Sequence, residues 1–233
     1  VEPDLEWDFR LKNVWSINCS GHKYGLVYPG IGWVIWRSKE ALPEDLIFWV
    51  SYLGGEEATM AINFSRSASQ IVGQYYVLMR NGFEGFREIQ ERTLDVARYL
   101  AAEIEGMGMF ELYEDAGHIP IVCWGLKEDA NVAWSLYDLS DRLRMNGWLV
   151  PAYPMPADMQ ETTVQRVVAR QDFSMQLAIK LVEDIKKEID TLSKARFVTG
   201  NTQGVINTGF DHSGRSAADR GDGVKGKAPT SQK

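Results

Sequence analysis

The stretch Ser20-Gly21-His22-Lys23-Tyr24-Gly25 places a hydroxyl, an imidazole and a primary amine together on one glycine-flanked loop. Short apolar segments precede and follow it, at 14–17 and 32–36, and each is typical of a β-strand. The segment from Gly21 to Gly32, both included, contains four glycines and a proline, a composition that is typical of turns. The sequence therefore predicts two short strands joined by a loop that carries functional side chains.

The side chains of this loop suit a covalently bound cofactor. A lysine amine can form a Schiff base with the aldehyde of pyridoxal phosphate, and a neighbouring hydroxyl and imidazole can hydrogen-bond the phosphate. Glycines let the backbone approach such a ligand closely. A solvated Gly-His-Lys turn is the alternative for the stretch taken alone, because so short a motif recurs by chance.

The rest of the chain alternates between strand-like and helix-like apolar patterns. A second glycine loop is expected at 52–57, before the first helix. Strands that alternate with helices favour an α/β fold. The expected elements are helices at 67–81, 84–105, 131–146 and 174–193 and strands at 119–124 and 165–170.

The net charge and the cysteine content limit which partners and which cellular compartment the sequence favours. With 25 basic and 32 acidic residues the formal net charge is -7, which repels nucleic-acid phosphates and anionic membrane surfaces. Cys19 and Cys123 are the only cysteines, and the sequence has neither a signal pattern nor a long apolar stretch. We therefore expect no nucleic-acid or membrane partner, and a reducing, cytoplasmic setting.

The loop of Lys23 resembles the cofactor-lysine region of bacterial glutamate decarboxylases, from Ser16 to Gly25 and again from Gly32 to Arg37. The resemblance runs in order from Trp7 to Leu192. It implies a fold-type I pyridoxal-phosphate lyase that converts L-glutamate to 4-aminobutyrate and carbon dioxide, with a role in acid resistance. The further matching segments are Tyr52–Gly55, Ala61–Arg66, Leu136–Ser140 and Gly147–Ala152.

The resemblance is to the C-terminal part of such an enzyme. It implies the C-terminal part of the large cofactor-binding domain at 1–106, a small C-terminal α/β domain at 107–194 and a tail at 195–233. The tail holds few large apolar side chains, so burial cannot offset its ordering entropy and we expect it to be flexible. A homodimer or higher homo-oligomer is also implied.

Four residues take cofactor roles by this resemblance. Lys23 would bind pyridoxal phosphate covalently, while Ser20 and His22 would contact its phosphate. Ser65 is similar to the serine that reaches the phosphate of a neighbouring subunit's cofactor, which would place the active site at a dimer interface. A helix N-cap is the alternative for Ser65, and the two roles can coexist because a helix N-terminus attracts phosphate.

Substrate and regulatory roles follow in the same way. Arg170 is similar in position to the arginine that pairs with the substrate α-carboxylate; Arg166 is the alternative, and a surface ion pair is possible for either. Tyr52 resembles a lid tyrosine that delivers a proton, or it is an aromatic anchor of its loop. His212 is a candidate pH switch that blocks the site as pH rises, or an inert tail residue.

The family's cofactor chemistry needs groups that this sequence does not contain. The carboxylate that keeps the pyridine nitrogen protonated is expected upstream of Asp4 and Asp8, and the chain begins with Val1 rather than Met. We therefore expect a fragment that is inactive in isolation. The alternatives are a fragment of another pyridoxal-phosphate-dependent amino-acid decarboxylase, or a non-catalytic assembly module with an exposed apolar surface.

Overall fold

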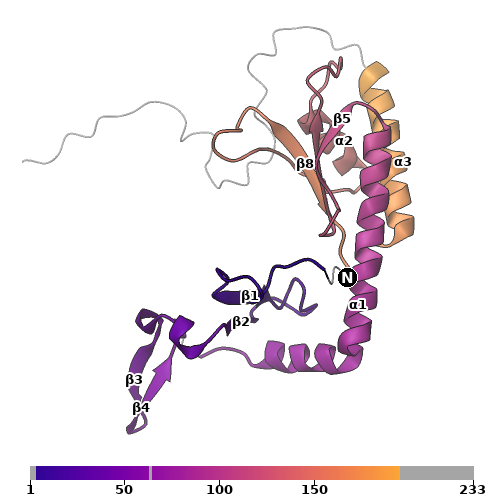
Figure 1. Ribbon diagram of the computed structural model, residues 1–233. Coiled ribbons are helices and arrows are strands. Elements are labelled where there is room, and N and C mark those ends of the chain that lie inside the picture. Colours follow the sequence, from indigo (N-terminus) through magenta and orange to yellow (C-terminus); the bar gives the residue numbers. More distant parts are fainter. Residues whose placement is uncertain (1–3, 63–64, 195–233) are drawn as a thin grey trace, which may run out of the picture. The chain divides into compact units, whose positions relative to one another are not determined.

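The computed structural model describes residues 4–62 and 65–194. Within them the chain forms two compact units, the first ending at Glu91 and the second beginning at Arg92 (Figure 1). The mixture of helices and sheets confirms the α/β class. The domain boundary predicted after residue 106 stays a prediction, and the predicted tail at 195–233, with His212 in it, lies outside the described residues.

The first unit contains the two strands predicted around the loop of Lys23. β1 (Ser16–Ser20) and β2 (Gly32–Trp36) pair antiparallel along five residues each. β1 begins two residues later than the apolar pattern suggests, because the Val14 N–H bonds to the Leu11 carbonyl at 3.2 Å and closes a turn. The prediction of two short strands joined by a loop is confirmed.

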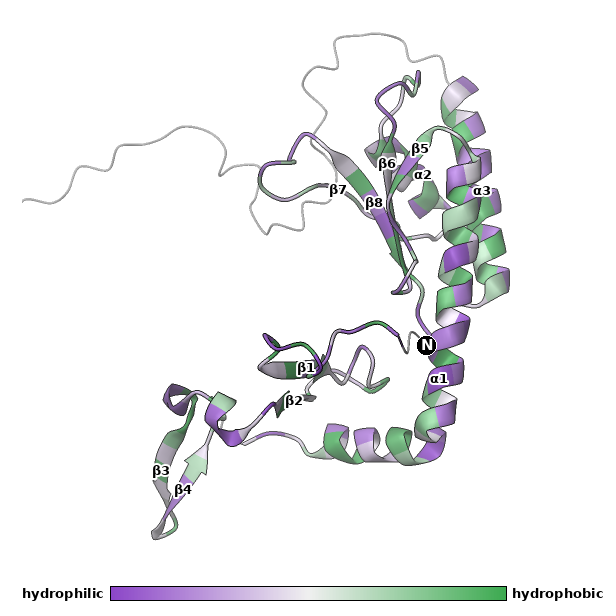
Figure 2. Cartoon of the chain, in the orientation of Figure 1, coloured by the Kyte–Doolittle hydropathy of each residue, from purple (hydrophilic) through white to green (hydrophobic). Residues whose placement is uncertain are grey.

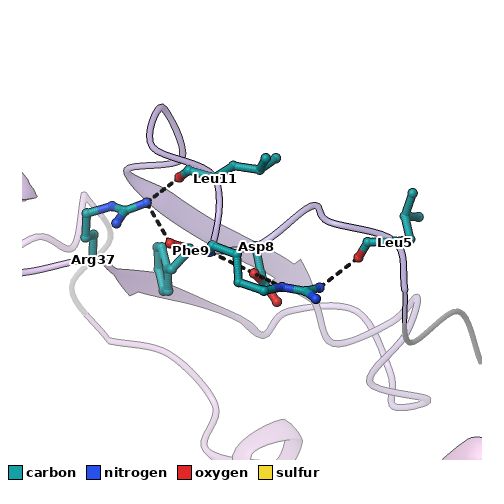
Figure 3. Close-up of polar contacts among 6 residues, drawn as sticks. Leu5, Asp8, Phe9, Leu11 and Arg37 are labelled. Atoms are coloured by element: carbon teal, nitrogen blue, oxygen red, sulfur yellow. Dashed lines mark hydrogen bonds and ion pairs between the residues drawn. The ribbon is translucent and has the colours of Figure 1, made fainter.

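One arginine ties the segment before β1 to the end of β2. The Arg37 guanidinium donates hydrogen bonds to the backbone oxygens of Phe9, Leu11 and Val14, with lengths of 3.0 Å to Phe9 and 2.7 Å to Val14. Figure 3 shows the bonds to Phe9 and Leu11. The guanidinium also lies 5.4 Å from the centroid of the Phe9 ring. A planar group with five donors suits several carbonyls at once, so Arg37 holds this segment in place.

The segment predicted as a loop at 52–57 is a β-hairpin. Two short 3₁₀ helices, η1 (Lys39–Ala41) and η2 (Glu44–Leu46), precede it. β3 (Phe48–Tyr52) pairs antiparallel with β4 (Gly55–Thr59) across a turn of two residues. These residues have positive φ, 52° at Leu53 and 84° at Gly54, a combination that matches the twist of the strands. The loop prediction is wrong for residues 55–57, because their small and polar side chains form a strand that is exposed on both faces.

α1 (Ser69–Gly106) consists of two helical segments that meet at Gly82. Gly82 has a φ of 58° and a ψ of -168°, which is outside the helical range, so the helix bends there. Beyond the C-terminal end, Gly108 has a φ of 80° and its N–H bonds to the Glu105 carbonyl at 3.0 Å. The two helices predicted at 67–81 and 84–105 are confirmed.

The second unit holds an antiparallel sheet in the order β5-β6-β8-β7. β6 (Ile121–Leu126) and β8 (Thr163–Val168) are the two predicted strands, each displaced by two residues. β5 (Phe110–Asp115) and β7 (Ala152–Pro154) were not predicted. β5 is rich in acidic residues and β7 has three residues including a proline, so neither shows an apolar strand pattern.

The helices of the second unit pack their apolar faces into one core. α2 (Leu136–Met145) and α3 (Met175–Lys194) correspond to the helices predicted at 131–146 and 174–193, although α2 begins at Leu136 rather than at 131. The Ser135 hydroxyl caps α2, and the Ser174 hydroxyl accepts an N–H of the first turn of α3 at 3.3 Å. The apolar face of α3 is buried. The largest fully buried apolar side chains are Leu100, Ile104, Phe110, Trp124, Leu139, Leu143, Leu181 and Ile185.

Two buried carboxylates join α3 to α2 and to the residues after it. Asp184 accepts hydrogen bonds from Trp148 Nε1 at 2.8 Å and from Lys180 Nζ at 3.1 Å. Glu188, 2% exposed, accepts from Arg142 Nε at 2.7 Å and from Asn146 Nδ2 at 2.9 Å. These hydrogen bonds stabilise the charged form and so lower the pKa of both carboxyls. The largest contribution comes from Trp148 for Asp184 and from Asn146 for Glu188.

These contacts predict an acid-sensitive second unit. A carboxyl whose pKa is lower in the folded than in the unfolded state stabilises the fold above its unfolded pKa and stops doing so as pH falls through the folded pKa. Glu188→Gln should lower the free energy of unfolding by about 1–3 kcal/mol at pH 7 and should flatten its decline below the ordinary carboxyl range. Urea unfolding from pH 7 to pH 3 measures both effects.

Asp190→Asn is the matched control, since Asp190 lies on the same helix and makes an exposed ion pair with Lys194. It should change the free energy of unfolding by less than about 0.5 kcal/mol at any pH in this range. An acid profile of Glu188→Gln that matches that of the unsubstituted chain would contradict the assignment.

Candidate active site

The turn that follows β1 brings three predicted cofactor residues together. Ser20 is the last residue of β1 and is half-buried, whereas the side chains of His22 and Lys23 are exposed. The Lys23 N–H bonds to the Ser20 carbonyl at 3.1 Å, and the Lys23 carbonyl accepts from the Leu26 N–H at 3.3 Å. Hydroxyl, imidazole and amine are therefore carried by one tight turn.

Two glycines allow the loop to close on itself. A Cβ at Gly21 would lie 2.6 Å from Ile31 Cγ2, and a Cβ at Gly25 would lie 2.4 Å from Gln74 Oε1 and 2.6 Å from the Gly21 carbonyl oxygen. The Gly21 N–H bonds to the Ile31 carbonyl at 2.9 Å. Any larger residue at 21 or 25 would force the loop apart. The backbone is packed inside the loop while the polar side chains of His22 and Lys23 face solvent.

Two glutamines of α1 hold this loop, and neither was among the predicted site residues. Gln74 Nε2 donates to the Gly25 carbonyl at 2.9 Å, and Gln70 Nε2 donates to the Pro29 carbonyl at 3.3 Å. They are four residues apart and so share one face of the helix. The feature of the sequence that could have indicated them is a pair of glutamines, four residues apart, within an otherwise apolar helical pattern.

Most of the buried residues of the first unit lie in or against this loop. Among its described residues only Gly21, Gly25, Ala41 and Gln74 are buried. The neighbouring Cys19 thiol is half-buried, and burial raises its pKa, so it stays protonated near neutral pH. A hydroxyl, an imidazole and an amine on a preorganised, glycine-packed turn fit a ligand that has both an aldehyde and a phosphate.

Two further predicted residues of this unit lie on other segments. Tyr52 is the last residue of β3, beside the hairpin turn, and its side chain is outside the described part of the chain. Ser65 is exposed and lies four residues before the first residue of α1, too far to be its N-cap. Within the described residues Ser65 makes no hydrogen bond to the loop of Lys23. Its cofactor role and that of Tyr52 stay predictions.

The two candidate carboxylate-binding arginines belong to the second unit. Arg170 follows β8 and is exposed, with its Nε 3.7 Å from Asp172 Oδ1. Arg166 lies within β8, and its guanidinium is 5.9 Å from the centroid of the Tyr153 ring. An exposed guanidinium with a single distant carboxylate partner can still bind a ligand carboxylate. The substrate role of Arg170 stays a prediction.

The described ranges hold neither a metal-binding cluster nor a helix that could span a membrane. No three His, Cys, Asp or Glu side chains in 4–62 and 65–194 form a group that could hold a metal ion. In the same ranges, none of the helices has the length and apolarity needed to cross a membrane.

The chain is similar to known proteins over the loop of Lys23 and well beyond it. The pyridoxal-dependent decarboxylase conserved domain matches residues 2–127, which include the loop of Lys23 and more than half of the chain. A glutamate decarboxylase of Lactococcus lactis subsp. cremoris is 59% identical over 212 residues, covering 91% of this chain and 46% of that protein. The chain thus spans about half the length of this relative.

Solved structures agree with the fold. The glutamate decarboxylase of Lactobacillus brevis has a TM-score of 0.77 and 56% identity, covering 85% of this chain and 45% of that one. The sphingosine-1-phosphate lyase of Burkholderia pseudomallei, at 20% identity and a TM-score of 0.65, covers 82% of this chain and 41% of its own, and shares the fold. The predicted family, its fold-type I architecture and its cofactor, pyridoxal phosphate, are confirmed, and the chain belongs to the pyridoxal-dependent decarboxylases.

Proposed function

We propose that this chain is the cofactor-lysine part of a glutamate decarboxylase, which converts L-glutamate to 4-aminobutyrate and carbon dioxide. The observation that carries the proposal is the glycine-packed turn on which Ser20, His22 and Lys23 lie together. The high identity to proteins named glutamate decarboxylases supports glutamate as the substrate. We expect the whole protein to catalyse the reaction and this chain in isolation to be inactive.

Each residue of the turn has a role that its chemistry supports. Pyridoxal phosphate, when bound, supplies an aldehyde that an amine can attack and a ring that withdraws electrons from the substrate α-carbon. The exposed Lys23 amine holds the cofactor, and the Ser20 hydroxyl and His22 imidazole donate hydrogen bonds to its phosphate. Because the turn is already closed by backbone bonds, little ordering is needed when the ligand binds.

The remaining candidates complete the proposal. Arg170 orients the substrate α-carboxylate through two parallel hydrogen bonds, with Arg166 as the alternative. Tyr52 delivers a proton to the carbon that loses carbon dioxide, Ser65 reaches the phosphate in a neighbouring subunit, and His212 is the pH switch that blocks the site as pH rises. The free state of Cys19 and Cys123 supports a cytoplasmic protein, and a role in acid resistance is part of the same proposal.

Replacement of the lysine tests the proposed function. Borohydride reduction of the whole protein with pyridoxal phosphate should leave the cofactor on the peptide that contains Lys23, and glutamate should yield 4-aminobutyrate. Lys23→Ala should abolish both, whereas Lys39→Ala, at an exposed lysine of the same unit, should change neither. Covalent cofactor that persists in Lys23→Ala would rule the proposal out.

The arginines can be separated by matched substitutions. Arg170→Lys keeps the charge but loses the two-pronged geometry, so the KM for glutamate should rise roughly 10- to 100-fold. Arg166→Lys should change it by less than about twofold. Steady-state kinetics of the two variants decides between them, and the reverse ranking would assign the carboxylate to Arg166. Turnover of a panel of amino acids addresses the alternative that the enzyme is another amino-acid decarboxylase.

An exposed apolar surface supports a homodimer or higher homo-oligomer as part of the proposal. The first segment of α1, residues 69–81, and the residues just after it expose many large apolar side chains, and Figure 2 colours much of this segment as hydrophobic. Such a surface on a monomer marks an interface. It also favours the assembly-module alternative. The exposed side chains are Ile71, Val72, Tyr75, Tyr76, Leu78, Met79 and Phe83.

A charge placed on this surface tests its role in assembly. Met79 is 68% exposed and Met145, on α2 of the second unit, is 75% exposed. Met79→Glu should shift the whole protein to smaller species, because burying an unpaired carboxylate at an interface is unfavourable. Light scattering after size-exclusion chromatography measures the mass. Met145→Glu should leave it unchanged, and equal masses for the two variants would contradict an interface here.

A further inference from the structure

We infer that Gln74 is a positioning residue for Lys23, acting through the peptide group between Gly25 and Leu26. Where it concerns the cofactor, this inference rests on the proposed function. Gln74 is 5% exposed, and its Nε2 donates to the Gly25 carbonyl at 2.9 Å. It is the only buried polar side chain among the described residues of the first unit.

Both ends of that peptide group are held. Its carbonyl, from Gly25, accepts the hydrogen bond of Gln74, and its N–H, from Leu26, donates to the Lys23 carbonyl at 3.3 Å. Because a peptide group is planar, fixing the direction of the carbonyl also fixes the direction of the N–H. The helix side chain therefore orients the hydrogen bond that closes the turn on Lys23 itself.

The backbone beyond this peptide needs such support. Leu26 has a φ of 57°, in the left-handed region that is unfavourable for a leucine. Rotation of the Gly25–Leu26 peptide would let Leu26 leave that region, and it would break the bond to the Lys23 carbonyl. The hydrogen bond from Gln74 opposes the rotation. Without it we expect the turn to relax and Lys23 to lose its fixed position.

The amide oxygen of Gln74 indicates that the side chain contributes through its Nε2 donor. Gln74 Oε1 is buried and has no hydrogen-bond partner. It lies against the loop, where a Cβ on Gly25 would be only 2.4 Å away. A buried amide oxygen without a partner is unfavourable, and a methionine of similar length would fill the same space without that penalty. The bond to the Gly25 carbonyl is the contribution that methionine cannot make.

Amide exchange in the cofactor-free whole protein tests the positioning role. Gln74→Met should speed the exchange of the Leu26 and Val27 amides by roughly tenfold, because one buried hydrogen bond is lost. Gln70→Met is the matched control: it removes a longer, exposed bond to the Pro29 carbonyl of the same loop and should speed exchange by less than about twofold. Equal exchange in both variants would overturn the inference.

A second variant separates the hydrogen bond from general loss of structure. In Gln74→Glu the protonated carboxyl can donate to the Gly25 carbonyl, whereas the ionised carboxylate cannot. Protection of the loop should therefore be like that of the unsubstituted protein at low pH and like that of Gln74→Met at high pH. The unsubstituted protein, measured over the same pH range, shows how much of any pH dependence comes from the exposed His22, Lys23 and Tyr24 of this loop. A pH-independent Gln74→Glu would overturn the inference even if Gln74→Met fails to fold.

Cofactor trapping distinguishes this inference from the proposed function. If Gln74 positions the lysine, borohydride trapping of pyridoxal phosphate on Lys23 should be roughly tenfold slower in Gln74→Met and unchanged in Gln70→Met. Absence of trapping in the unsubstituted protein would remove the proposed function and leave the exchange result to decide the role of Gln74. Normal trapping together with normal exchange in Gln74→Met would overturn the inference alone.

Discussion

Close packing of backbone against backbone inside the loop 21–31 is the constraint on which the candidate site depends. Gly21 and Gly25 leave no space for a Cβ, so the loop can close only with glycine at these positions. Closure turns the intervening His22 and Lys23 side chains outward. A turn held from within by its own backbone keeps its reactive side chains in place without using them for support.

The two units obtain their stability in different ways. The second unit buries a continuous apolar core among its sheet, α2, α3 and the second segment of α1. In the first unit the described residues are mostly exposed, and their order comes from strand pairing and from hydrogen bonds of Arg37, Gln70 and Gln74 to backbone carbonyls. A unit with so little buried apolar area is typical of a part that gains its core from further chain or a partner, which agrees with the proposed assembly.

Buried polar groups recur at the places where elements must meet in one arrangement. Gln74 joins α1 to the loop of Lys23, and the carboxylates Asp184 and Glu188 join α3 to α2 and Trp148. Apolar packing tolerates small shifts between elements, whereas a hydrogen bond of fixed length and direction does not. Each unit therefore has polar contacts that fix how its own elements meet, and in the first unit this contact holds the loop of Lys23.

By itself the sequence determined the residue types and the local elements. The loop of Lys23, its flanking strands, the helices broken at Gly82 and ended at Gly106, and the buried face of α3 all follow from periodicity and glycine placement, which act over short distances. The hairpin at 48–59, the edge strands β5 and β7 and the role of Gln74 were decided by tertiary structure. The hydrogen bond between residues 74 and 25 joins segments far apart in the chain, which no local pattern encodes. β4, β5 and β7 pair with neighbouring segments, but their polar, acidic or proline-containing sequences show no apolar strand pattern, so pairing with a partner strand decided their structure.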